Sequence, residues 1–276
     1  MADLVRMTAH GIATAPPPEG RVVMSRVGSG ESHVLSLYPA IKLVLEGEEI
    51  HEIGGRPHVL CPGRLLMVDA GAPYRTVVRR SQQTLGLCIY MPCAPVDAAP
   101  QALILGRGFL QAADATTLGR LVTAWAARLH GSDMPAGQAA SVVDDLAKLL
   151  PEALATAASA LDQLSAQRMS TRREALIRLE CARAHLHSNL DRLISLHELA
   201  AVAGMSSFHL ARYFREAYGV APARYHRNLR LDHAAQRLLR AEASVTQVAL
   251  DAGYGQLSAF THAFRRHFGR PPSGAA

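Results

Sequence analysis

One pattern occurs twice near the C-terminal end of this chain. The copy that starts at Ser195 reads SLHELAAVAGMSSFHLARYFREAYGVAP, and the copy that starts at Ser244 reads SVTQVALDAGYGQLSAFTHAFRRHFGRPP. The residues that return after 49 or 50 positions are Ala200 and Ala249, Gly204 and Gly253, Phe214 and Phe264, Arg215 and Arg265, Gly219 and Gly269, and Pro222 and Pro272. Self-similarity at such a period indicates one structural unit used twice.

Each copy predicts a helix, a tight turn and a second helix. Its first residue is a serine with Glu198 or Gln247 three positions later, which is the capping box that begins many helices. Gly204 or Gly253 then gives the backbone the freedom to leave the first helix. Apolar residues at core spacing follow in the second helices, namely Phe208, Leu210, Tyr213 and Phe214, and Phe260, Ala263, Phe264 and Phe268. This is the helix-turn-helix arrangement, whose second helix enters the major groove of DNA.

The charge of the chain is unevenly distributed. The chain has 276 residues, which is enough for two domains. The segment 165–276 holds 16 arginines and 8 acidic residues, whereas the segment 1–164 has a small acidic excess. A basic segment around a repeated helix-turn-helix fits a surface that meets phosphates, although a solvated basic helix face would have the same composition.

Cysteine usage and hydropathy indicate a cytoplasmic, reducing setting without a membrane partner. The four cysteines have no C-x-x-C spacing and are too few to form a disulfide scaffold. The sequence has no apolar run of 18 residues and no signal-peptide pattern at its N-terminus.

The N-terminal half predicts a flexible leader over 1–20 and then a β domain. Short strand-like runs separated by Gly or Pro turns are typical of a small sandwich or barrel, whose interior can hold one small ligand. These runs are RVVMSRV, AIKLVLEG, EEIHEI, RLLMVDA, YRTVVRR and TLGLCIYM, between Arg21 and Met91.

Helices are expected after the β domain. Residues 117–130 place Leu121, Trp125 and Leu129 on one face. A second helix, over 138–163 with a kink or break near Pro151, places Val142, Val143, Leu146, Leu149, Leu150, Leu154 and Leu161 at helical spacing. These stripes either pack on the β domain or form a dimer seam, and the dimer is slightly favoured.

A linker over 165–173 and a helix over 174–193 lead to the first copy. A long helix over 222–242 joins the two copies, and its expected buried residues are Leu229, Leu231, Ala235, Leu238 and Leu239. About 20 helical residues span roughly 30 Å, which would hold the two second helices about one DNA turn apart, near 34 Å.

The repeated region resembles the DNA-binding domain of the AraC/XylS family of transcription regulators. The resemblance rests on LHELAAVAGMSSFHLARYFREAYGVAPARY, LRLDHAAQRLL and VTQVALDAGYGQLSAFTHAFRRHFGRPP. The order of the expected elements over residues 21–165, a β domain followed by helices, is similar, more loosely, to the family's regulatory half. It implies an α+β chain with a cupin-like sensor barrel over 21–112, a helical dimerisation region over 113–166 and an all-α domain with two helix-turn-helix motifs over 167–276.

The resemblance also implies a function and its residues. The expected protein is a sequence-specific regulator, an activator by preference, that binds double-stranded promoter DNA and RNA polymerase as a homodimer and responds to a small-molecule effector. The residues expected to read bases are Phe208, Ala211, Arg212, Leu257, Ser258, Thr261 and His262. Those expected to contact phosphates are Ser206, Ser207, Arg215, Arg265 and Arg266. Arg212 is the strongest base reader, because a guanidinium can bond O6 and N7 of guanine together, with a phosphate-only contact as the alternative.

Other chemistry is less favoured by the sequence. His51, His58 and Cys61 lie close together, but no fourth metal ligand is evident. Tyr74 stands where a metal-binding cupin often has histidine, so we expect no metal, no cofactor and no enzymatic activity. The alternatives are a cupin-type enzyme with a DNA-binding tail, a constitutive regulator whose barrel only dimerises, and a regulator that senses oxidants or electrophiles through Cys61, Cys88 or Cys93.

Overall fold

The computed structural model of this chain describes residues 3–7, 20–35, 38–69, 73–79, 83–91, 108–131, 136–240 and 243–274. Two compact units, Met1–Glu180 and Cys181–Ala276, make up the chain, and we call them unit 1 and unit 2. The boundary between them falls inside one helix, α4 (Met169–His187).

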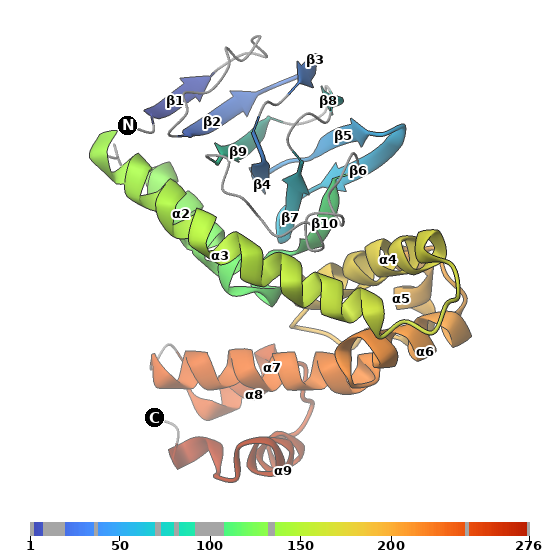
Figure 1. Ribbon diagram of the computed structural model, residues 1–276. Helices are drawn as coiled ribbons and strands as arrows, with labels where there is room; N and C mark the ends of the chain where they lie inside the picture. The colour runs from blue at the N-terminus through green and yellow to red at the C-terminus, as the bar shows by residue number, and fades with distance from the viewer. Residues whose placement is uncertain are drawn as a thin grey trace. The chain divides into compact units, whose positions relative to one another are not determined.

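Unit 1 is built on two sheets of mostly antiparallel strands (Figure 1). The larger sheet has six strands in the order β1 (Asp3–Met7), β2 (Arg21–Val27), β9 (Thr84–Tyr90), β4 (Ala40–Glu46), β7 (Arg64–Val68) and β10 (Phe109–Ala112). The smaller has four, in the order β3 (Gly30–Leu35), β8 (Pro73–Val78), β5 (Glu49–Ile53) and β6 (Arg56–Leu60). Only β1 and β2 pair in parallel among the described strands. Over the described residues the strands therefore form two separate sheets, and the expected closed barrel is not formed.

Each predicted strand run contains an observed strand, and four strands were not predicted. β1, which pairs with β2, lies within the segment expected to be a flexible leader. The other three are β3, β6 and β10. The central strands β4 and β9 are buried on both faces, which is why they read as continuous apolar runs rather than as alternating ones.

Two helices of unit 1 pack beside the larger sheet. In α3 (Ala136–Asp162), which runs on through Pro151, all of the predicted stripe except Leu149 is buried. In α2 (Thr117–Gly131) the buried residues are Leu118, Val122, Ala126 and Leu129, so the predicted face, with Leu121 and Trp125, was wrong by about one position. Most of the two stripes therefore packs within unit 1, while Leu121, Trp125 and Leu149 stay half-buried.

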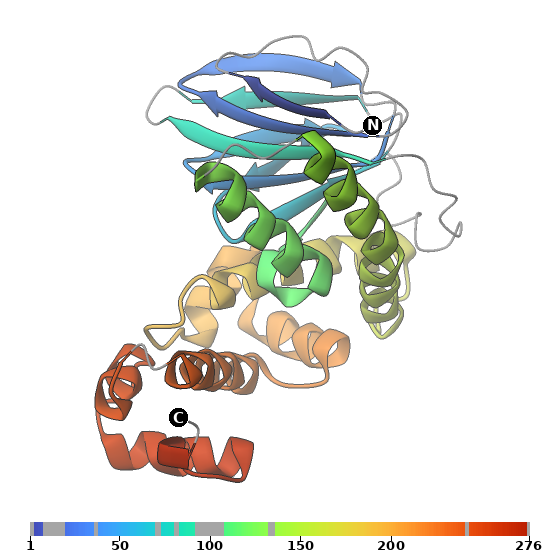
Figure 2. The same ribbon diagram turned by 90° about the vertical axis from the view of Figure 1, so that its left-hand side faces the viewer.

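Unit 2 is helical and contains the two repeated copies (Figure 2). The first copy forms α5 (Leu196–Ala203) and α6 (Ser207–Tyr218), and the second forms α8 (Val245–Asp251) and α9 (Leu257–Phe268), followed by the short helix η2 (Pro272–Gly274). Between them runs α7 (Pro222–Leu239). The core of the second copy includes residues of α7, α8 and α9: Leu231, Ala234, Leu238, Val248, Ala249, Ala252, Phe260 and Phe264.

The helix α7 packs against both copies. Near its start, the ring of Tyr225 lies 5.3 Å from that of Phe214 in α6, and further on Leu231 and Leu238 enter the core of the second copy. Of the residues expected to be buried, Leu239 is 64% exposed and Phe208, placed at core spacing, is 70% exposed, while Leu229 and Ala235 are only half-buried. Leu239 and Phe208 lie on sides of their helices that no described neighbour covers.

Candidate nucleic-acid interface

The two copies turn with the same backbone hydrogen bonds. In the first, the Gly204 and Met205 amides donate to the carbonyls of Ala201 and Ala200, and in the second, the Gly253 and Tyr254 amides donate to those of Leu250 and Ala249. Each pair is the Schellman arrangement, with a glycine in the left-handed region at φ 60° or 71°. The repeat in the sequence therefore produces a repeat in the turn that aims each second helix.

Serines begin the first helix of each copy as predicted, but the rest of the capping box differs. The Ser195 and Ser244 hydroxyls accept hydrogen bonds from the amides of Glu198 and Gln247, at 3.1 and 3.2 Å. The Glu198 carboxylate, however, accepts from Arg192, and the Gln247 amide donates to Asp251. In the first copy the carboxylate thus ties α5 to the segment before it, whereas in the second copy the amide bonds a residue one turn further along α8 itself.

The helix α6 has a buried side and an exposed side. Leu210 and Phe214 are completely buried and anchor the helix, while Phe208 and Arg212 are exposed and Ala211 is half-buried. The structure thus brings the three predicted base-reading residues of this helix to one accessible face. Ser206 precedes them as the helix cap, and its hydroxyl accepts from the His209 amide at 3.3 Å.

The Arg212 guanidinium lies over aromatic rings in the structure. Its central carbon is 4.6 Å from the ring centroid of Tyr213 and 5.9 Å from that of Phe208, and its Nε is 3.8 Å from Glu216. These are weak, exposed contacts, so the Arg212 guanidinium can exchange them for a stronger partner. Arg212 is therefore held near the exposed face but is not locked in a competing buried pair.

The helix α9 repeats this division. Phe260 and Phe264 are completely buried, whereas Leu257, Ser258 and His262 are exposed and Thr261 is half-buried. Of the residues expected to contact phosphates, Ser206, Arg215, Arg265 and Arg266 are exposed and Ser207 is half-buried. Every predicted site residue of unit 2 is therefore accessible. The base-reading residues lie on α6 and α9, and the residues expected to contact phosphates lie on or directly before the same two helices.

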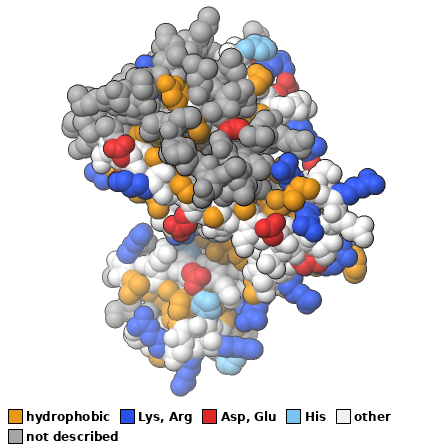
Figure 3. All heavy atoms as spheres, in the orientation of Figure 1, with side chains coloured by type: hydrophobic (Ala, Val, Ile, Leu, Met, Phe, Trp, Pro, Cys, Tyr) orange, Lys and Arg blue, Asp and Glu red, His pale blue; other side chains and the backbone are white. Residues whose placement is uncertain are grey.

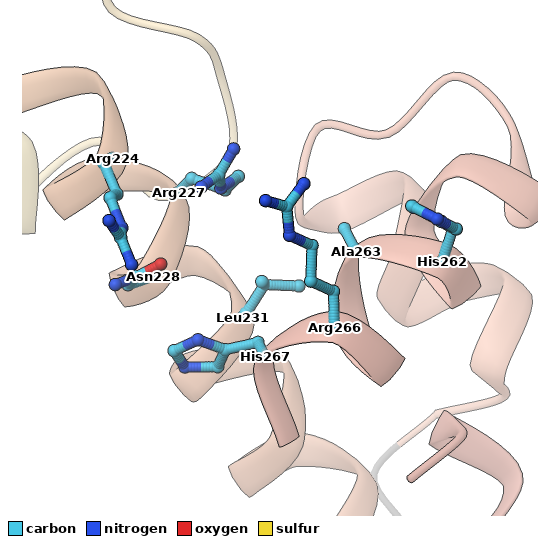
Figure 4. A pocket seen from close by; sticks show the side chains of 8 residues that line it. All are labelled: Arg224, Arg227, Asn228, Leu231, His262, Ala263, Arg266 and His267. Carbon is cyan, nitrogen blue, oxygen red and sulfur yellow. The ribbon is translucent and has the colours of Figure 1, made fainter. Parts of the chain in front are cut away.

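A basic cleft between α7 and α9 was not predicted as part of the site (Figure 4). It has a volume of about 250 Å³ and is lined by Arg224, Arg227, Asn228, Leu231, His262, Ala263, Arg266 and His267. Only His262 and Arg266 belong to the predicted set. The available signal was the spacing of Arg224, Arg227, Asn228 and Leu231 at i, i+3, i+4 and i+7, which places them on one face of α7.

Many of the acidic side chains of unit 2 are already paired with basic ones. Arg237 donates to Asp251 at 2.6 Å and holds the pKa of that carboxyl below its usual value. Arg192 and then His185 lower the pKa of Glu198 to about 2. Asp232 lies 2.8 Å from His267. With Glu198 and Asp251 paired to arginines, the remaining arginines dominate the field around unit 2, and basic side chains are visible on the face shown in Figure 3.

Known proteins are similar to this chain in sequence. The family model of a helix-turn-helix domain matches residues 199–275. The transcriptional activator NphR of Rhodococcus sp is 30% identical over 284 residues, which cover 97% of this chain and 75% of NphR. The chain belongs to the AraC/XylS family of transcription regulators. It therefore has a DNA-binding helix-turn-helix domain, and the repeated region is that domain.

Other members match this AraC/XylS regulator over a shorter length. The right origin-binding protein of Escherichia coli K12 is 34% identical over 88 residues, which cover 32% of this chain and 30% of that protein. The crystal structure of an AraC-type regulator from Chromobacterium violaceum covers 36% of this chain and 88% of its own, with 28% identity and a TM-score of 0.35. The DNA-binding domain of AdpA, solved in complex with a target DNA, covers 35% of this chain and 87% of its own, with 30% identity and a TM-score of 0.34.

Unit 1 of this AraC/XylS regulator carries buried polar groups between its two sheets. His51 is completely buried, with Nδ1 3.0 Å from the Thr76 hydroxyl and Nε2 3.0 Å from a Glu49 carboxylate oxygen. The Lys42 ammonium lies 4.9 Å from the ring centroid of Tyr74. Burial opposes the charge of Lys42, but Cys88, Tyr90 and Glu49 together raise its pKa above the usual value. Charged groups are rarely buried without a use or a partner.

The metal and thiol candidates of the sequence lie in the same unit. His51 and His58 are register partners in β5 and β6, but within the described ranges no three His, Cys, Asp or Glu side chains are close enough to hold a metal. Burial raises the pKa of the Cys61 thiol, which disfavours the reactive thiolate. Cys88 pairs in register with Lys42, and Cys93 lies outside the described residues. No helix in the described part of the chain is long and apolar enough to cross a membrane.

Proposed function

We propose that this AraC/XylS regulator places α6 and α9 in two successive major grooves on one face of promoter DNA. The observation that carries the proposal is the repeat of the turn: both second helices are aimed by the same Schellman bonds, and both copies pack on the single helix α7. The 18 residues of α7 span about 27 Å, comparable to the roughly 34 Å between equivalent grooves.

The proposed base readers are the accessible residues near the start and middle of the two helices. In α6 they are Phe208, Ala211 and Arg212, and in α9 they are Leu257, Ser258, Thr261 and His262. Arg212 would bond the two acceptors of a guanine, while Ala211 and Leu257 would make apolar contacts such as those with a thymine methyl. Ser206, Ser207, Arg215, Arg265 and Arg266 would contact phosphates, which fix the position of the protein without reading sequence.

Selection of binding sites from random duplexes by the full chain tests this assignment. Arg212→Ala should relax the selected sequence at one base position, at a cost of roughly 1–3 kcal/mol for the preferred site. Arg266→Ala should weaken binding to all sequences alike and reduce the dependence of affinity on salt. An unchanged selected sequence with Arg212→Ala would remove that residue from the base readers.

We also propose that unit 1 responds to a small-molecule effector bound between its two sheets. The buried Lys42, Glu49, His51 and Thr76 support this, because they place charged and hydrogen-bonding groups in the interior, where apolar residues are often at least as stable. Binding would favour one arrangement of unit 1 and the DNA-binding domain over another. A thermal-shift screen of metabolites on the full chain and on Lys42→Met tests it, and the absence of any stabilising compound would favour a constitutive regulator.

The remaining proposals concern the promoter. NphR is a transcriptional activator, so we propose that this chain activates transcription by contacting RNA polymerase. We also propose that residues 21–112 are the sensor, residues 113–166 a dimerisation region and residues 167–276 the DNA-binding domain. Since most of the two expected stripes packs within unit 1, a homodimer would use their half-buried residues Leu121, Trp125 and Leu149 or another surface. Light scattering of the full chain tests the homodimer, and transcription from a selected promoter tests activation. Stoichiometric metal bound to the purified protein would instead favour the cupin-type enzyme.

A further inference from the structure

The cleft between α7 and α9 brings together positive charge from two helices. Arg224 and Arg227 come from α7 and Arg266 comes from α9, and all three side chains are exposed. Figure 4 shows the guanidinium groups of Arg227 and Arg266 facing each other across the cleft. Within the part of the chain that the structure describes, none of the three arginines has a carboxylate partner, and Asp232, the nearby acid, is paired with His267 at 2.8 Å.

Such an arrangement is electrostatically incomplete without an anion. Two guanidinium groups that converge repel each other, whereas an anion between them would be attracted to both. Guanidinium groups also match the oxygens of a phosphate in a planar, two-bond geometry. The Asn228 side chain, half-buried beside them, adds a further donor. The chemistry of the cleft therefore selects a phosphate group.

The position of the cleft indicates which phosphate this is. His262 and Arg266 are one turn apart on α9, so the cleft opens beside the residues proposed to face the groove. Two helices in successive major grooves on one face of a duplex have one minor groove between them, bordered by the phosphate backbones. The element that connects the two helices, α7, must pass over that stretch of backbone.

We propose that the α7–α9 cleft binds a backbone phosphate in the middle of the bound DNA, between the two major-groove contacts. Arg227 and Arg266 would hold the phosphate, and Arg224 would lie beside it on α7. The linker helix then contributes directly to affinity and fixes the spacing of the two recognition helices on the duplex. This inference rests on the proposed docking of α6 and α9.

The first test is the salt dependence of DNA affinity. Arg224→Gln combined with Arg227→Gln in the full chain should lower the slope of log affinity against log salt by about 1 to 2, and weaken binding about tenfold or more at roughly 0.1 M salt. Arg26→Gln combined with Arg79→Gln removes two positive charges from unit 1 and is the matched control. Glutamine retains helix propensity, and circular dichroism verifies the fold. An unchanged slope relative to the control would overturn the proposal.

The second test locates the phosphate. Neutral methylphosphonates are placed one at a time along a duplex selected by the full chain. Substitution in the central stretch should weaken the wild type about tenfold and the double variant distinctly less, because only Arg266 is left in the double variant to hold that phosphate. Equal losses in both proteins, or losses confined to the flanks, contradict the proposal.

Two further arms separate the possible failures. Titration with inorganic phosphate at constant ionic strength should show only weak binding. The cleft would instead be a site for a free anion if phosphate binds at micromolar concentration, the double variant abolishes that binding, and the slope of log DNA affinity against log salt is unchanged. If Arg212→Ala alters the selected sequence while the cleft variants change nothing, only the cleft inference fails. If neither changes DNA binding, the proposed docking of α6 and α9 fails as well.

Discussion

Arg192 and Glu198 are joined by two hydrogen bonds, of 2.6 and 3.1 Å, at the start of the first helix-turn-helix. His185 lies 3.0 Å from the same carboxylate. The pair connects the segment before α5 to its first turn, and the Arg192 hydrogen bonds, followed by that of His185, lower the Glu198 pKa from 4.5 to about 2. A carboxyl with a lowered pKa stabilises the fold above its unfolded pKa, and this contribution is lost as the pH falls toward the folded value.

We therefore predict that Glu198→Gln lowers the urea midpoint of the full chain at pH 7, and that its difference from wild type shrinks between about pH 4.5 and 2. Urea unfolding of the full chain at several pH values measures it. Glu152→Gln, an exposed change on α3, is the control and should leave the midpoint unchanged. A difference between wild type and Glu198→Gln that persists undiminished below pH 3 would show that the pair acts through something other than its charge.

Two glycines with similar backbone angles should respond differently to alanine. Gly253 has φ +71° and an added Cβ would lie 3.0 Å from the Asp191 carbonyl oxygen, whereas Gly269 has φ +75° with nothing within 4 Å. Gly269→Ala should cost about 1–2 kcal/mol for the left-handed backbone alone. Gly253→Ala adds the close approach and should cost distinctly more. Free energies of unfolding from denaturant titration compare the two, and equal costs would mean that the segment at Asp191 yields to the methyl group.

The sequence predicted those parts of the fold that local patterns specify. The capping serines, the turn glycines and the buried Phe214 and Phe264 all follow from helix periodicity and turn chemistry. The buried face of α2 did not, because packing against neighbouring elements decides which of two overlapping apolar stripes is buried, and here Val122 is buried rather than Trp125.

The polar strand β6 was missed because its sequence lacks the apolar pattern of a strand. It begins with the exposed Arg56 and Pro57, and its buried residues are only His58 and Leu60. The basic cleft could not be predicted from α7 alone, because Arg266 reaches it from a helix that follows later in the sequence. Contacts between elements distant in the chain are set by packing, which a single-helix pattern does not contain.

A second pH effect is expected in unit 1. Burial, followed by the charge of His51, lowers the pKa of His58 from 6.5 to about 4, and its Nε2 has no hydrogen-bond partner among the described residues. Below pH 6.5 the unfolded state takes up a proton at this residue that the folded state refuses, so stability falls between pH 6.5 and 4, by roughly 3 kcal/mol in total. His58→Gln should flatten this dependence, measured by thermal unfolding, while His33→Gln, at an exposed histidine, should not. A profile that stays equally steep in His58→Gln would assign the loss of stability to other groups.

Phe208 separates binding from stability most clearly. It is 70% exposed at the start of α6, whereas Phe260, in the first turn of α9, is completely buried. Phe208→Ala removes an apolar surface that already meets water, so the free energy of unfolding should change by less than about 0.5 kcal/mol. Its DNA affinity should nevertheless fall, because the ring would lose its apolar contact in the major groove and the Arg212 guanidinium its neighbouring ring. Phe260→Ala should cost about 3–5 kcal/mol of stability through the cavity that it leaves. Denaturant unfolding and DNA titration of both variants distinguish the two roles, and Phe208→Ala with unchanged affinity would remove this residue from the interface.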